Sequence, residues 1–227
     1  MKFVTAPLVV IMTISLLPCL AIWLGVCVIK SVIWSFVLYH GLCIIPAIIW
    51  ERKLWLNDLK FPKPLHVLQL LVHSALFCGT TLWLYHNFGA HLLSNENALQ
   101  VIVSRGYKKE LLLPLCLFFV IMNPVLEEIY WRGVILNKLD SFNLPWKNFA
   151  LLWSSAAYGA FHYPIFQVIM YRGWAELGIL LLTIYGAGLA LLYRRTKSLV
   201  LVSLSHALLT DLAAVALIVT LLQNNAM

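Results

Sequence analysis

Long apolar stretches separated by short polar loops fill this chain, and they restrict its fold more than any other feature. Each stretch is close to the ~20 residues that an α-helix needs to cross the hydrocarbon core of a bilayer. We predict about seven spans, with six or eight as alternatives, because only Lys30 separates the first two. The approximate bounds of the stretches are 4–29, 31–50, 65–87, 111–138, 148–164, 173–193 and 199–223.

The composition indicates a membrane protein rather than a soluble domain. The chain has 227 residues, of which 62% are hydrophobic and 11% charged, and its mean hydropathy is +0.89. A soluble domain of this length needs far more charge on its surface. Because backbone polar groups in lipid must be satisfied within their own segment, we expect an all-α polytopic transmembrane helix bundle. We expect one domain over residues 1–227, since even the polar stretch 87–110 contains apolar positions.

The net charge of +7 is interpreted first as a signal of topology. With seven spans, the side of the N-terminus holds ten Lys and Arg residues and the other side holds five. The positive-inside rule then predicts a cytoplasmic N-terminus, and we expect the cytoplasmic (inner) membrane of a prokaryote. The lipid bilayer is therefore an expected partner. Nucleic acid is not, because the basic residues are scattered through short loops without interleaved aromatic residues.

Two adjacent carboxylates, Glu127 and Glu128, interrupt the fourth apolar stretch. Ionised carboxylates at membrane depth are costly unless they face protein or water and find a partner. Arg132 follows Glu128 by one helical turn and is its predicted partner. Glu127 lies about 100° around the helix from Glu128, outside the predicted ion pair, so we interpret it as the acid with a chemical role. Pro124 predicts a break in this helix, which favours a hydrated cavity beside the acids.

Two further polar clusters interrupt later apolar stretches. Tyr158 and His162 are one helical turn apart and share a face, and so do His206 and Thr210 in the last stretch. A carboxylate, two imidazoles and a hydroxyl on separate helices can converge only in the core of a bundle. Such a set can activate a water molecule and stabilise an oxyanion.

These clusters, Glu-Glu-x-x-x-Arg, aromatic-x-x-x-His and His-x-x-x-polar in this order, resemble the CAAX-protease and bacteriocin-processing family of intramembrane glutamic proteases. That family includes the Ras-converting prenyl endopeptidases. The resemblance covers roughly residues 111–218, which would form the catalytic core. It implies that Glu127 is the catalytic base, that Glu128 and Arg132 support it, and that His162 helps to position the attacking water.

The chain departs from the family pattern at two positions. The second motif begins with Tyr158 in place of the usual Phe, which adds a hydroxyl group. The third motif usually has Asn or Asp four residues after its histidine, where this chain has Thr210. The resemblance therefore assigns oxyanion stabilisation to His206 with Thr210. Asp211 follows at about 140° from His206 on an ideal helix, so it reaches the site only if the helix is locally distorted.

We interpret the chain as an intramembrane endopeptidase that cleaves a peptide or a membrane-tethered protein near its end. Water activated by Glu127 would attack directly, and no cofactor is expected. A zinc ion bound by Glu127, His162 and His206 is the less favoured alternative, because the chain lacks a His-Glu-x-x-His motif and the predicted Glu–Arg pair balances charge without a metal. Prenylated CAAX ends, bacteriocin leaders, pheromones and sorting-signal tails all fit this reading.

Two other classes of function stay open at this point. The altered third motif fits a non-enzymatic immunity or binding protein for a peptide such as a bacteriocin, built on the same scaffold. Carboxylates in a membrane helix also fit a proton-coupled transporter. Outside the clusters, His40 is interpreted as a hydrogen-bonded core residue. Gly186 and Gly188 are interpreted as a close-packing face.

Overall fold

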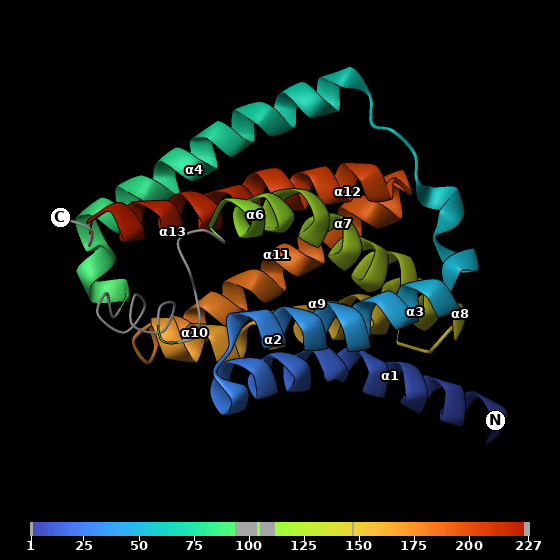
Figure 1. Ribbon diagram of the computed structural model, residues 1–227. Coiled ribbons are helices and arrows are strands. Elements are labelled where there is room, and N and C mark those ends of the chain that lie inside the picture. Colours follow the sequence, from blue (N-terminus) through green and yellow to red (C-terminus); the bar gives the residue numbers. More distant parts are fainter. Residues whose placement is uncertain (1, 94–103, 105–111, 147, 225–227) are drawn as a thin grey trace.

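The computed structural model describes residues 2–93, 104, 112–146 and 148–224, which form helices joined by short connections (Figure 1). No β-strand occurs within these ranges, so the predicted all-α bundle is confirmed. Most of the polar stretch 87–110 lies outside the described residues. The α-helices are α1 (Lys2–Trp23), α2 (Val32–Phe36), α3 (Ile45–Trp50), α4 (Pro64–Leu92), α6 (Leu112–Leu117), α7 (Asn123–Glu128), α8 (Asn137–Ser141), α9 (Phe149–Ala160), α10 (Tyr163–Ile169), α11 (Trp174–Thr196), α12 (Leu199–His206) and α13 (Leu212–Asn224).

Wider π-helical turns interrupt several of these helices. A π-turn closes its hydrogen bonds over five residues instead of four, and such turns are frequent at functional sites. The helix that carries the acids has one that ends at Met122, two residues before Pro124, where the sequence predicts a break. The π-helices are η1 (Leu24–Ile29), η2 (Val37–Ile44), η6 (Phe118–Met122), η7 (Ile129–Leu136) and η8 (Ala207–Asp211), and the short 3₁₀ turns are η3 (Arg52–Leu54) and η4 (Leu56–Asp58).

By length and composition, six helical runs of the described chain can cross a membrane, and the protein is a multi-pass integral membrane protein. This number lies within the predicted six to eight. The predicted span 148–164 is not among the six, because it is divided into α9 and α10 at Phe161 and His162. The six runs are Pro7–Ile29, Val32–Trp50, Pro64–Gly89, Leu113–Ser141, Trp174–Thr196 and Leu199–Leu221.

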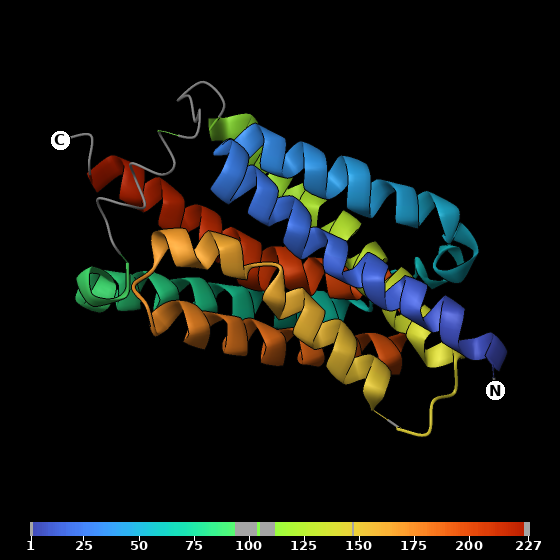
Figure 2. The same cartoon turned by 90° about the horizontal axis from the view of Figure 1, so that it is seen from below.

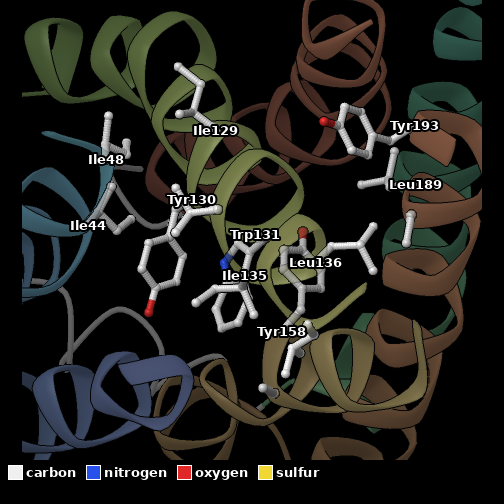
Figure 3. Close-up of a cluster of buried hydrophobic side chains, with 14 of the residues drawn as sticks. Ile44, Ile48, Ile129, Tyr130, Trp131, Ile135, Leu136, Tyr158, Leu189 and Tyr193 are labelled. Carbon is white, nitrogen blue, oxygen red and sulfur yellow. The ribbon is translucent and has the colours of Figure 1, made fainter. Parts of the chain in front are cut away.

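The helix that contains the acid pair lies in the middle of the bundle. In Figure 1, α1 and α4 lie on opposite sides, with α7, α11 and α12 between them, and Figure 2 shows the same bundle from below. Every residue of η7, which continues from α7, is buried. Large side chains from η7 and α9, among them Trp131 and Tyr158, form the surrounding core (Figure 3). The acids therefore face protein rather than lipid.

The helices α9 and α11 pack closely against each other beside this core. A Cβ atom added to Gly186 would lie 2.8 Å from Cδ1 of Tyr158, so only glycine lets the ring approach α11 this closely. A Cβ atom on Gly188 would meet no atom within 4 Å. The predicted close-packing role therefore holds for Gly186 and not for Gly188.

Candidate active site

The predicted ion pair between Glu128 and Arg132 is present and fully buried. Arg132 Nη1 donates to Glu128 Oε1 at 2.7 Å, and the two side chains are 3% and 0% exposed. The second guanidinium nitrogen, Nη2, donates to the carbonyl oxygen of Gly186 at 2.9 Å. The Arg132 Cζ atom also lies 4.6 Å from the centroid of the Tyr158 ring. Arg132 thus joins the acid helix to α9 and α11.

His206, from the third sequence cluster, lies next to both Glu127 and Glu128. Its Nδ1 lies 2.8 Å from Glu128 Oε1, and its Nε2 lies 3.2 Å from Asp211 Oδ1 and 3.9 Å from Glu127 Oε2. Each ring nitrogen therefore faces a carboxylate oxygen. Only the imidazolium form, with an N–H on both nitrogens, donates in both directions. His206 thus lies among three carboxylates, and in its imidazolium form it is a second cation beside Arg132.

The helix that follows His206 is distorted, and this decides which of the two residues after it contacts the His206 ring. In η8 the amide of Leu212 donates to the carbonyl of Ala207, which is the five-residue spacing of a π-helix. The wider turn brings Asp211 onto the face of His206. Thr210 instead donates its hydroxyl to the backbone carbonyl of His206 at 2.9 Å. Asp211 therefore contacts His206 because the helix is locally distorted, which is the condition stated for it from the sequence.

Tyr158 reaches the cluster, and His162 lies beside Tyr158 with the two ring centroids 5.3 Å apart. The Tyr158 hydroxyl lies 3.3 Å from His206 Nε2, so the hydroxyl that distinguishes this motif from the family pattern has a partner in the site. His162 Nδ1 lies 2.9 Å from the carbonyl oxygen of Tyr158. A carbonyl only accepts, so this nitrogen carries the proton and Nε2 is the acceptor of the neutral ring. The three sequence clusters thus meet in one place.

Two buried residues that the sequence reasoning did not place in the site extend the network. Asn123 donates from Nδ2 to Asp211 Oδ2 at 3.3 Å, and its Oδ1 lies 3.0 Å from His40 Nε2. His40 is hydrogen-bonded, as expected, but it belongs to this network rather than to an apolar face. A signal for Asn123 was available, since this polar residue precedes Glu127 by one helical turn and shares its face.

Three buried polar atoms close to one another have no hydrogen-bond partner within the described part of the chain. They are Glu127 Oε2, the Tyr39 hydroxyl and Trp131 Nε1. The Tyr39 hydroxyl is near enough to interact with both the Glu127 carboxylate and the Trp131 indole. Buried polar groups are normally paired, and a group of three marks a place that suits a water molecule or a polar group of a substrate.

The described residues contain no group of three or more His, Cys, Asp or Glu side chains arranged so that they could hold a metal ion. The titratable side chains of the site instead bind one another. Glu128 joins Arg132 to His206, and Asp211 occupies the other face of His206.

Fold and site together define a class: a multi-pass membrane helix bundle with a cluster of acids, histidine and arginine buried in its core. Residues 109–210 match the family model described as Rce1-like, type II CAAX prenyl endopeptidase. The matched region is less than half of the chain, and it is similar to a family of endopeptidases, which hydrolyse peptide bonds. The match ends one residue before Asp211 and does not include the N-terminal helices. Searches of curated proteins and of solved structures gave no match.

Proposed function

We propose that this protein is an intramembrane glutamic endopeptidase that hydrolyses a peptide, or the end of a membrane-tethered protein, with water activated by Glu127. The observation that carries the proposal is the different environment of the two adjacent acids. Glu128 Oε1 accepts hydrogen bonds from both cations, Arg132 and His206. Oε2 of both acids is buried without a hydrogen-bond partner among the described residues, but Glu127 differs because its nearest cation contact, Oε2 to His206 Nε2, is 3.9 Å long. One acid is held in a structural pair, and the other is free to exchange a proton.

The charge of the cluster supports this assignment. Three carboxylates, Glu127, Glu128 and Asp211, lie around two cations, Arg132 and His206. With every group ionised, the cluster carries one uncompensated negative charge inside the protein, where such a charge is costly. Taking up one proton removes that cost. Glu127 is the acid that hydrogen bonds hold least, so it is the best placed to take a proton from water and later to release it.

The proposed reaction needs one water molecule and no covalent intermediate. Glu127 removes a proton from water while the water oxygen attacks the scissile carbonyl carbon, and Nε2 of His162 accepts the second hydrogen bond of the water. The hydroxyl of Tyr158 donates to the oxyanion, and so does the Nε2–H of His206, which it shares with Oδ1 of Asp211. When the C–N bond breaks, the proton on Glu127 passes to the leaving amine.

The family description supports a substrate class. A type II CAAX prenyl endopeptidase acts on a C-terminal sequence in which a prenylated cysteine precedes two aliphatic residues and a final residue. We therefore take a prenylated peptide of this kind as the first substrate to test. Bacteriocin leaders and other membrane-tethered tails are the next substrates to test.

A chelation experiment tests the mechanism without metal. Purified protein in lipid vesicles should cleave a fluorogenic, prenylated CAAX peptide at the same rate before and after exhaustive chelation, and elemental analysis should find no stoichiometric zinc. Activity that is lost on chelation and restored by zinc would instead support Glu127, His162 and His206 as ligands. Peptide binding without cleavage would point to an immunity or binding protein, and ion flux across the vesicles to a transporter.

A further inference from the structure

The N-terminal part of the chain, outside residues 109–210, contributes to the site through η2. His40 and its neighbour Tyr39 are only 6% and 3% exposed, although both lie in a stretch that carries no family motif. The His40 ring is stacked on Phe36, with centroids 5.4 Å apart, and meets the edge of Phe118 at 5.2 Å. Its Nδ1 lies 3.2 Å from the carbonyl oxygen of Phe36. The ring is thus held in one orientation, with Nε2 toward Asn123.

The contacts of Asn123 fix the direction of the hydrogen bonds. The Asp211 carboxylate only accepts, so the amide nitrogen of Asn123 must face it, and the amide oxygen must face His40. His40 Nε2 therefore donates to Asn123, and since the Phe36 carbonyl also only accepts, Nδ1 donates to it only when the ring is an imidazolium. The chain runs from His40 through Asn123 to Oδ2 of Asp211, which leaves Oδ1 of the same carboxylate toward Nε2 of His206.

We propose that His40 and Asn123 are positioning residues that hold the Asp211 carboxylate against His206. Asp211 lies five residues after His206, and a π-turn brings it to the site, so its carboxylate needs a second point of attachment to keep one orientation. Asn123 supplies that attachment, and His40 fixes the Asn123 amide. The expected effect on catalysis rests on the proposed function. The hydrogen-bonded contact between Asn123 and Asp211 does not, and it is tested separately.

Histidine ring nitrogens give a test of the geometry that does not depend on activity. Protein labelled with nitrogen-15 histidine shows the His40 and His206 ring signals, which His40→Gln and His206→Gln assign. We expect Asn123→Leu to shift the ring signals of both histidines. The control, Asn87→Leu, changes an exposed residue whose amide donates to the carbonyl of Trp83 on its own helix, and should shift neither. Unchanged His206 signals in Asn123→Leu would overturn the proposal.

Kinetics with the prenylated CAAX peptide separates positioning from general structural support. His40→Leu and Asn123→Leu should lower kcat by up to about 10²-fold with KM unchanged, because the substrate is not contacted. His40→Gln should recover most of this loss, since its amide also donates to Asn123. If wild-type protein does not cleave the peptide, the proposed function is wrong while the nitrogen-15 result still decides the geometry. If kcat is unaffected in active protein, the positioning role is wrong.

Discussion

Replacing Glu128 with glutamine should reduce the free energy of unfolding by about 3–5 kcal/mol, the cost of leaving a buried charge without its partner. Glu128 is 0% exposed, and its Oε1 accepts from Arg132 at 2.7 Å and lies 2.8 Å from His206 Nδ1. Glutamine retains the shape of the side chain but removes the charge. Arg132 then lies buried among neutral partners, namely the glutamine amide oxygen, the carbonyl of Gly186 and the Tyr158 ring.

The matched control is Glu127→Gln, which changes the adjacent residue in the same way. Glu127 has no hydrogen-bonded cation, since its Oε2 is 3.9 Å from His206 Nε2. Its replacement should leave the free energy of unfolding nearly unchanged. Unfolding of both variants in mixed micelles, followed by the intrinsic fluorescence of tryptophan, which includes the buried Trp131, measures the difference. Equal losses in the two variants would contradict the division of roles between the acids.

Replacing Asp211 with leucine should reduce turnover of the prenylated peptide on the order of 10²-fold, while Thr210→Val should leave it nearly unchanged. Asp211 holds the ring nitrogen of His206 that faces Tyr158 and Glu127. The Thr210 hydroxyl is bonded to a backbone carbonyl of its own helix. The motif spacing alone would lead to the opposite expectation, since Thr210 occupies the family position.

These two variants are neighbours on one helix turn, so each controls for nonspecific damage by the other. Rates should be compared at equal amounts of folded protein. An inactive Thr210→Val together with an active Asp211→Leu would show that Thr210 completes the third motif in the working enzyme.

The helical fold and the acid–arginine pair could be predicted because general physics determines both. A backbone in lipid must satisfy its own hydrogen bonds, so long apolar stretches become helices. Residues four apart on a helix are neighbours, which gives the contact between Glu128 and Arg132 without any knowledge of tertiary structure. The break at Pro124 follows from the missing amide of proline in the same way.

The remaining parts of the site depend on features that leave no such pattern. A π-turn over Ala207–Asp211 shifts one residue around the helix, and nothing in the side chains of that segment signals it. The contact between His40 and Asn123 joins residues that are 83 positions apart, so it requires the packing of the whole bundle. A lone histidine in an apolar stretch is consistent both with a core residue and with a residue of the site. The fold shows that His40 is hydrogen-bonded to Asn123, which in turn is bonded to Asp211 in the candidate site.

The central claim is that Glu127 activates the water that cleaves the substrate. The most direct measurement compares wild-type protein with Glu127→Gln, at equal amounts of folded protein, on the prenylated peptide in water enriched in oxygen-18. Wild-type protein should release a fragment whose new carboxylate carries one oxygen-18 atom, and Glu127→Gln should release none. Cleavage by Glu127→Gln at the wild-type rate, with the same isotope in the product, would show that another group activates the water.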